Sequence, residues 1–210
     1  RQLGKVCFGA LKPEEGSVTV EDGTIIDSPA IAMKKRVGYV SKDRDVESLC
    51  LNASIEDNIS IAGMSEFAIN NFLILKNREK KYVNHQIEEL SIKCAGRDQS
   101  VSQLSGGNKQ KVVFGKWIGC GSEILILDCP TRGVDINTSH VIYQLLNEQK
   151  KKGVAVVCVI EDLDVVLELC DRIAVLCGGR ISGVVDGRTA TKEGIGLLMT
   201  KHEKGGAVNE

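Results

Sequence analysis

Two neighbouring residues, Asp128 and Cys129, occupy the position in the sequence where chemistry is most expected. They follow the apolar run Ile124 to Leu127, which is typical of a buried strand. A carboxylate at the tip of such a strand can hold Mg²⁺ through water, although it can equally well cap a turn or a helix. A site that cleaves a nucleotide would be expected to carry a second carboxylate here. A thiol, with an ordinary pKa of about 8.5, is mostly neutral near neutral pH and orients water poorly.

A second group suited to chemistry precedes that strand, in the stretch LSGGN at positions 104–108. Ser105 can cap the helix that follows, and Gly106 and Gly107 let a ligand approach the backbone closely. The free N–H groups and the dipole of a helix start bind anions. Ser-Gly-Gly alone is a weak signal, which a plain helix start would also explain. The signal is stronger here because the apolar strand that ends in Asp128 follows one helix later.

The composition is that of an ordinary globular protein. The 210 residues are 42% hydrophobic and 26% charged, with a net charge of −1, so one domain with a subdomain is expected and nothing favours nucleic acid or an anionic membrane. No apolar run approaches the roughly 18 residues that span a bilayer, and no signal peptide is visible. The first residue is Arg1, so we expect the sequence to be a trimmed piece of something longer.

The cysteines are numerous but scattered. There are eight, none forms a C-x-x-C pair, and His85, His140 and His202 lie in polar stretches far from any cluster of them. Cys158 and Cys177 lie inside apolar runs, where a thiol behaves as a small hydrophobic group. We therefore expect buried, reduced thiols of a cytosolic protein and not a metal site.

The pattern of the N-terminal half predicts a hairpin, short helices and a strand. The predicted elements are a tight turn at Asp22-Gly23, a helix capped by Ser28 and Pro29 that runs to about Arg36, a strand at 37–40, a polar loop at 41–48, a helix after a Ser54/Asp57 capping box and a wholly helical, more polar stretch from Ser65 to about Cys94.

The C-terminal half predicts strands alternating with helices. The predicted elements are a helix after Gly107 to about Ile118, strands at 123–128 and 154–160 around a helix from Ser139 to Lys152, a C-cap at Gly153, a helix at 163–169 and strands at 172–176 and 179–185. The strand–helix–strand order predicts a right-handed parallel crossover.

Three stretches in this order, LSGGNKQKV, ILILDCPTRGVD and DRIAVLCGGRISG, resemble the ATP-binding cassette (ABC) family. More narrowly, the chain resembles the second, C-terminal cassette of the fused ATPases of ribose/galactose/xylose-type sugar importers. The narrower resemblance rests on Asn108 in the signature, on PTRGVD at 130–135 and on YVSKDR at 39–44. It extends over about residues 1–200.

The resemblance implies an α/β fold with an ABC-type P-loop NTPase core. Such a core has a mostly parallel sheet, a small antiparallel β subdomain and a helical insertion, here at about 62–118, within one ATP-binding domain at 1–200 that is followed by a flexible tail at 201–210. A cassette opens with the phosphate loop G-x-x-x-x-G-K-[ST]. The segment RQLGKVCFGAL resembles the helix that directly follows that loop, so we expect the sequence to begin just past it.

The resemblance also assigns site residues, several of which depart from the family pattern. Cys129 stands at the position of the glutamate that polarises water, Glu161 at that of the switch histidine and Lys42 at that of the loop glutamine that senses Mg²⁺, where a lysine could pair with phosphate. Asp128 is implied as the Mg²⁺ residue. The implied contacts to ATP held by a partner cassette come from Ser105, Gly106, Gly107 and Asn108.

The resemblance thus implies an ATP-binding subunit of a bacterial sugar importer that uses ATP and Mg²⁺ at the cytoplasmic face of the membrane. Its expected partners are a second cassette, membrane permease subunits and a periplasmic or lipoprotein sugar-binding protein, and no nucleic acid. Its own hydrolytic site would be degenerate, although Cys129 could also reflect drift in a decaying gene. The alternatives are an importer of nucleosides or other small solutes, a non-transport cassette and a regulatory pseudo-ATPase.

Overall fold

The structure is a computed structural model that describes residues 2–69 and 73–200. The chain divides into two compact units, Arg1–Val159 and Ile160–Glu210, and each is described by itself. The predicted flexible tail at 201–210 lies outside the described residues. No helix among the described residues combines the length and the apolar character needed to cross a membrane.

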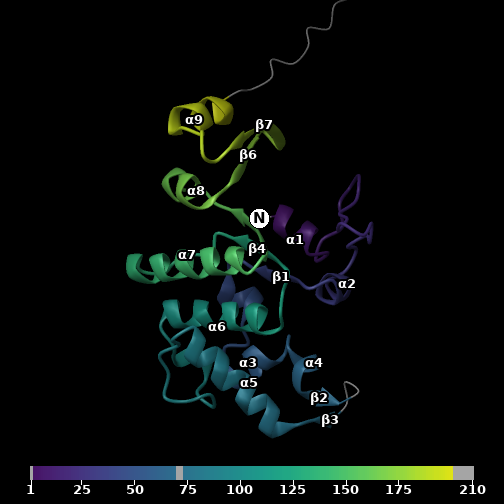
Figure 1. Cartoon of the computed structure of the whole chain (residues 1–210), viewed down its shortest axis with the longest axis vertical. Coiled ribbons are helices and arrows are strands. Elements are labelled where there is room, and N and C mark those ends of the chain that lie inside the picture. The colour runs from purple at the N-terminus through teal and green to yellow at the C-terminus, as the bar shows by residue number, and fades with distance from the viewer. Residues whose placement is uncertain (1, 70–72, 201–210) are drawn as a thin grey trace, which may run out of the picture. The chain divides into compact units, whose positions relative to one another are not determined.

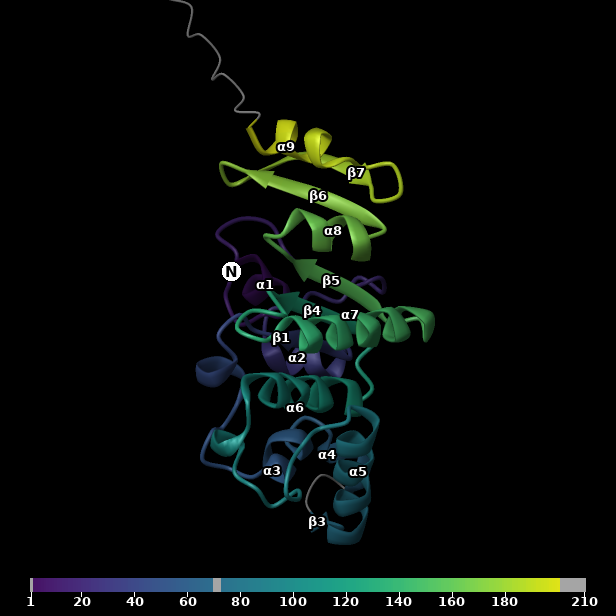
Figure 2. The same cartoon turned by 90° about the vertical axis from the view of Figure 1, so that its left-hand side faces the viewer.

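The first unit is built on a three-stranded parallel sheet. Its strands β1 (Val37–Val40), β4 (Ile124–Asp128) and β5 (Ala155–Val159) lie in the order β1-β4-β5, with Val40 opposite Leu127 and Asp128 opposite Val159. All three strands were predicted from their apolar runs and are confirmed. Figures 1 and 2 show α7 on one side of these strands and α1 and α2 on the other.

The elements before β1 agree with the sequence pattern. Helix α1 (Gln2–Cys7) packs on β4, and α2 (Pro29–Lys34) follows Ser28, with Pro29 in its first turn as predicted. The turn at Asp22-Gly23 is present as an isolated antiparallel bridge that joins Thr19 to Ile25, with Gly23 at φ 79°. The predicted hairpin is therefore reduced to one bridge.

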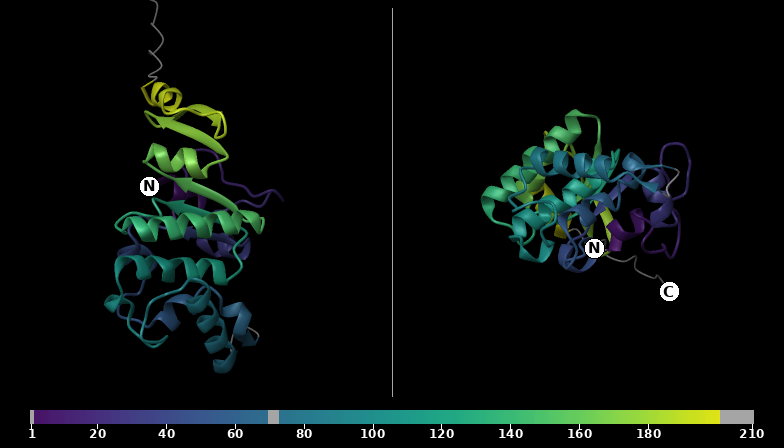
Figure 3. Two further views of the ribbon diagram at one scale, coloured as in Figure 1. Left: turned by 60° about the vertical axis from the view of Figure 1, so that its left-hand side comes forward. Right: turned by 90° about the horizontal axis from the view of Figure 1, so that it is seen from below.

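A helical insertion follows β1 and is held by a capping box. Ser54 Oγ accepts from the Asp57 N–H at 3.0 Å, and the Asp57 carboxylate accepts from the Ser54 N–H at 3.1 Å, as the sequence predicts. The insertion comprises α3 (Ile55–Ser60), α4 (Met64–Phe67), β2 (Ala68–Ile69), β3 (Leu73–Ile74), α5 (Lys76–Glu89) and a 3₁₀ turn at Val101–Gln103. Figure 3 shows it gathered on one side of α6, which α3 and α5 contact.

The prediction of one wholly helical stretch from Ser65 to Cys94 is wrong. Strands β2 and β3 interrupt it as a short antiparallel pair, in which Ala68 faces Ile74 and Ile69 faces Leu73. Isoleucine favours strands because its branched side chain is stiff at χ1, and the two asparagines at positions 70 and 71 of the sequence are poor helix formers. The helix resumes only at Lys76, the first residue of α5.

Helix α6 (Gly106–Gly119) forms the centre of the first core, since Val112, Val113 and Phe114 are completely buried. Trp117, on the same helix, contacts Phe8 edge to face, with ring centroids 5.6 Å apart. Helix α7 (Ile136–Lys151) begins earlier than the predicted Ser139, because Asp135 caps it. It ends before Gly153, whose φ of 89° suits the predicted C-cap glycine.

The second unit is small and mainly antiparallel. It contains α8 (Leu163–Leu169), β6 (Arg172–Cys177), β7 (Arg180–Asp186) and α9 (Lys192–Thr200), of which the first three were predicted. Strands β6 and β7 pair antiparallel with a register shift after Val175. Its core is formed by Val166, Ile173, Val175 and Ile195.

The expectation of buried thiols is wrong. None of the eight cysteines, all within the described residues, forms a disulfide, but seven are half-buried and Cys50 is exposed. Burial raises the pKa of the Cys7 thiol and of the Cys120 thiol above their ordinary values.

Candidate functional site

The LSGGN stretch forms the N-terminus of α6, and Ser105 is its N-cap as predicted. Ser105 Oγ accepts from the backbone N–H of Asn108 at 3.4 Å and from Asn108 Nδ2 at 3.0 Å. Asn108 Oδ1 in turn accepts from the Lys93 N–H at 2.9 Å. Because the Ser105 oxygen is the acceptor in both of its contacts, its own proton is left to donate to a ligand.

Asn108 therefore orients Ser105 within this chain. Both ends of its side-chain amide are engaged, the nitrogen by Ser105 and the oxygen by the Lys93 backbone. A glutamine is one methylene longer, so it could not make the same short link to the cap residue. The structure thus gives Asn108 a local role that sequence reasoning did not foresee.

The two glycines of the signature are each packed against another segment of the chain. A Cβ atom at Gly106 would lie 2.9 Å from Arg44 Nη2 and 3.0 Å from the Gly133 carbonyl oxygen. A Cβ at Gly107 would lie 2.8 Å from Thr138 Oγ1 and 2.9 Å from Thr138 Cγ2. Intrachain packing therefore already favours glycine at both positions, whether or not a ligand approaches them.

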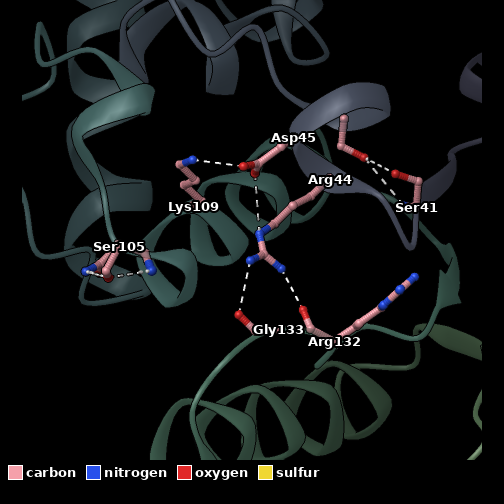
Figure 4. A network of polar contacts seen from close by, with 9 residues as sticks. Ser41, Arg44, Asp45, Ser105, Lys109, Arg132 and Gly133 are labelled. Carbon is pink, nitrogen blue, oxygen red and sulfur yellow. Dashed lines mark hydrogen bonds and ion pairs between the residues drawn. The ribbon is translucent and has the colours of Figure 1, made fainter.

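The segment after β1 is more ordered than the polar loop predicted for residues 41–48. Residues Arg44–Ser48 form a π-helical turn, a geometry that is rare and often found at functional sites. Arg44 donates from Nη1 to the Arg132 carbonyl at 2.7 Å and from Nη2 to the Gly133 carbonyl at 3.2 Å (Figure 4). This turn is therefore joined to the loop that follows Asp128.

Lysines from two helices anchor the same turn. Lys109 Nζ, on α6, lies 2.9 Å from Asp45 Oδ2, and Lys5 Nζ, on α1, lies 2.7 Å from Glu47 Oε1. Lys116, seven residues after Lys109, donates to the Ser48 carbonyl. Burial lowers the pKa of the Lys116 ammonium below its ordinary value. The turn is thus held along one face of α6.

Asp128 has the surroundings expected of a ligand-binding acid. Its side chain is 1% exposed at the end of β4, and its Oδ2 atom has no hydrogen-bond partner among the residues that the structure describes. A buried carboxylate oxygen without a partner is costly, so a ligand that contacts it would be strongly favoured. Asp128 does not cap α7, because Asp135 does.

Cys129 adopts a backbone conformation that is unusual for its residue type. Its φ is 49°, in the left-handed region, while its N–H donates to the Val159 carbonyl at 2.9 Å and its carbonyl accepts from the Arg132 N–H at 3.0 Å. Such a conformation costs on the order of 1–3 kcal/mol in a residue other than glycine and persists at positions where the surroundings enforce it. The half-buried thiol therefore begins a tightly specified turn.

That turn, PTRGVD, ends in a well-made helix cap. Asp135 accepts from the Thr138 N–H at 2.9 Å and from the Thr138 hydroxyl at 2.7 Å. The Thr138 backbone and hydroxyl hold the pKa of the Asp135 carboxyl below its ordinary value. Thr138 thus connects the cap of α7 to Gly107 on α6, the residue against which it packs.

The remaining predicted residues lie in two places. Lys42 is half-buried between β1 and the π-helical turn, in the first unit together with Asp128, Cys129 and the signature. Glu161 is exposed and belongs to the second unit, just before Asp162, which caps α8. The structure thus collects every predicted site residue except Glu161 in one compact unit.

The described residues fit a metal ion that arrives with a nucleotide, not a self-contained metal centre. Among residues 2–69 and 73–200, no group of three His, Cys, Asp or Glu side chains could hold a metal ion. Mg²⁺ in nucleotide sites is usually held by one or two carboxylates together with phosphate oxygens. The unpartnered oxygen of Asp128 is a suitable carboxylate for that arrangement.

Sequence reasoning missed Arg44 and Thr138, the residues that join the signature to its neighbours. The signal for Arg44 was present in YVSKDR, but the sequence contains nothing that links it to carbonyls roughly 90 positions later. Thr138 lay in a helix start that was predicted three residues too late. Both roles depend on contacts between distant segments.

Comparisons with known proteins identify the family to which this chain is similar. Residues 2–132 match the family described as ABC transporter. Ribose import ATP-binding proteins are 38% identical in Lacticaseibacillus paracasei and 40% identical in Bacillus subtilis, each over 200 residues. The match covers 95% of this chain but only 40% of either relative, so the chain spans less than half of their length.

Solved structures share the fold. A dimeric ATP-binding cassette in a post-hydrolysis state, bound to ADP and Pi, has a TM-score of 0.73 at 20% identity, covering 89% of this chain and 80% of that one. A nucleotide-free ATP-binding cassette has a TM-score of 0.71 at 23% identity, and the match covers 95% of this chain and 79% of that one. The fold expected from the resemblance, a parallel α/β core with small antiparallel strands, is confirmed. Because the family model matches more than half of its residues and its relatives are up to 40% identical over 200 residues, this chain belongs to the ABC transporter family.

Proposed function

We propose that this chain is the C-terminal cassette of a bacterial sugar importer's ATPase and that it contributes its signature to ATP held by a partner cassette. The observation that carries this proposal is the arrangement at Ser105. Its oxygen is held by two donors from Asn108 at the start of a 14-residue helix, while its own proton is left to donate outward. The helix dipole adds a favourable field for phosphate at this end.

The chain's own hydrolytic site is degenerate in this proposal. Cys129 carries a thiol where a water-polarising carboxylate is expected, and Glu161 would place a negative charge where the family has a histidine that touches phosphate. Asp128 retains an unpartnered oxygen that suits Mg²⁺, so this half keeps a nucleotide-binding feature without the groups that activate water. Mg²⁺–ATP held by the partner cassette would supply the phosphoryl group that Ser105 and the dipole of α6 stabilise.

The proposed partners are a second cassette, fused or separate, membrane permease subunits and a periplasmic or lipoprotein sugar-binding protein, at the cytoplasmic face of the membrane. The relatives named for ribose import support a sugar. Transport assays with radiolabelled solutes, in cells that express the intact transporter, distinguish ribose from another small solute such as a nucleoside as the substrate. A regulatory pseudo-ATPase would bind no partner in a nucleotide-dependent way.

The 210-residue chain alone is expected to show no significant ATP turnover. No phosphate-loop motif occurs in these residues, and a thiol occupies the position of the water-polarising group, whose loss commonly costs about 10²- to 10⁴-fold in rate. Steady-state release of phosphate by the purified chain measures this. Robust turnover that Asp128→Ala abolishes would show that this half hydrolyses ATP by itself.

The segment from Lys42 to Ser48 is expected to contact the membrane subunit. Val46 is the best position at which to detect this contact, because it is 84% exposed, whereas Asp45 is paired with Lys109. A photo-crosslinking amino acid in place of Val46 should give adducts with the permease in the intact transporter. The matched control is Ile136, an apolar residue that is 77% exposed on α7. Equal permease adducts from both positions, or none from position 46, would contradict the expectation.

A further inference from the structure

Arg44 makes an unusual pair of contacts. Its guanidinium donates to two consecutive backbone carbonyls, those of Arg132 and Gly133, at 2.7 and 3.2 Å. The Arg44 side chain is only 14% exposed, although the two acceptor residues lie at the surface, and hydrogen bonds from a charged donor are stronger than neutral ones. The planar fork of a guanidinium suits two neighbouring acceptors, and the single ammonium of a lysine does not reproduce that geometry.

The contact between Arg44 and the loop lies next to Gly106 of the signature. A Cβ atom at Gly106 would lie 2.9 Å from Arg44 Nη2 and 3.0 Å from the Gly133 carbonyl oxygen. Gly106 is the first residue of α6 and does not have the positive φ that would by itself favour glycine. Its small size is therefore what this junction uses, because any side chain would push Arg44 or the loop away.

Asp45 lies beside the guanidinium at ion-pair distance, without a hydrogen bond to it. Its Oδ1 lies 3.7 Å from Arg44 Nε, and its Oδ2 lies 2.9 Å from Lys109 Nζ (Figure 4). Lys109 is three residues beyond Gly106, on the first turns of α6. The Arg44 guanidinium thus lies between the Asp45–Lys109 ion pair and the backbone of the loop, where the π-helical turn, α6 and the loop meet.

We propose that Arg44 is a positioning residue that joins the π-helical turn, the signature end of α6 and the loop 131–135 into one rigid unit. This inference rests on the proposed function, in which Ser105 acts on nucleotide bound by the partner. In this role Arg44 acts through the backbone of the loop, to which it donates, and not by binding nucleotide. It holds the surface that Ser105 belongs to and links that surface to the segment proposed to meet the membrane subunit.

The first test measures the loop in the full 210-residue chain. The Arg132 N–H donates to Cys129 and the Val134 N–H donates to Thr131, so these two amides report whether the loop is ordered. Arg44→Ala should speed their hydrogen exchange about 10-fold or more, and Arg44→Lys should restore little of the protection. The matched control is Arg36→Ala, which removes an exposed arginine paired with Glu123. Unchanged exchange in Arg44→Ala, or full protection in Arg44→Lys, would overturn the proposal.

The second test is a double-mutant cycle in the intact transporter. Arg44→Ala and Gly106→Ala should each lower kcat for ATP about 10-fold and leave KM within about twofold, because the phosphate grip of the partner is untouched. Combined, they should cost less than the sum of the two losses, since the added methyl group meets Arg44 and the Gly133 carbonyl to which Arg44 donates, so both changes disturb the same junction. Additive losses, or a change confined to KM, would overturn the role of Arg44.

The two proposals fail separately. If Ser105→Ala leaves turnover unchanged, the proposed function fails, while faster exchange in Arg44→Ala still supports the junction. If exchange is unchanged in Arg44→Ala while Ser105→Ala abolishes turnover, the proposed function stands and the positioning role of Arg44 is wrong. Thermal melts of each variant show whether a loss reflects unfolding of the chain.

Discussion

Replacing Ser105 by alanine in the intact transporter is expected to lower transport-coupled ATP turnover by about 10²- to 10³-fold. Removal of one preorganised donor to developing charge typically costs about 2–4 kcal/mol of transition-state stabilisation. The Ser105 oxygen is positioned by two contacts from Asn108, so its hydroxyl needs no reorganisation when phosphate arrives. Steady-state ATPase assays with the sugar-binding protein and permease present measure the effect.

The helix cap complicates this experiment and also provides its control. Ser105→Ala also removes an N-cap, which costs about 1 kcal/mol of stability. Ser105→Asp keeps a good cap but presents a carboxylate to phosphate, so turnover should fall while the melting temperature is retained. Ser102→Ala, at an exposed serine nearby that contacts Ser100, should change neither quantity. Gly107→Asp is a less informative change, because its Cβ would clash with Thr138 inside this chain.

The proposed division of labour predicts an asymmetry between the two sites. Cys129→Glu should alter turnover little, because several groups of this half depart from the family pattern at once and such groups act as a unit. The strained φ of 49° at position 129 adds to this expectation, because a glutamate there would have to adopt the same left-handed conformation. If Ser105→Ala leaves turnover near wild type while Cys129→Glu raises it several-fold, the assignment of roles is wrong.

Phe114→Ala is expected to destabilise the first unit by about 3–5 kcal/mol, enough to unfold a marginal domain. The phenylalanine is 0% exposed on α6, the helix whose first turn carries the signature and whose lysines hold the π-helical turn. Its removal would leave a cavity that the surrounding close-packed side chains fill only in part. Urea denaturation followed by Trp117 fluorescence measures the change.

The matched control for this prediction is Ile136→Ala. Ile136 is also a large apolar residue, but it is 77% exposed at the start of α7, so its truncation should cost well under 1 kcal/mol. A loss at Phe114 no larger than the loss at Ile136 would mean that the core around α6 does not hold the first unit together.

The amino-acid sequence by itself determined the elements whose signals are local. Strands β1, β4 and β5 follow from runs of apolar residues, and the capping box at Ser54 and the cap at Ser105 follow from residues three or fewer positions apart. The family followed from three motifs in order, LSGGNKQKV, ILILDCPTRGVD and DRIAVLCGGRISG, because each of them is short and contiguous. Local hydrogen bonds and periodic burial leave such patterns in the sequence directly.

Only the tertiary structure decided what depends on distant segments. The pairing of β2 with β3 broke a stretch that looked helical, because cross-strand contacts outweighed a weak helix preference. The partners of Arg44 lie 88 and 89 positions away, and Gly107 is matched to Thr138 on another helix. Nor could the sequence show that the Asp128 oxygen is buried without a partner, since burial is a property of the packed chain. The sequence therefore identified the chemical groups, and packing decided which of them meet.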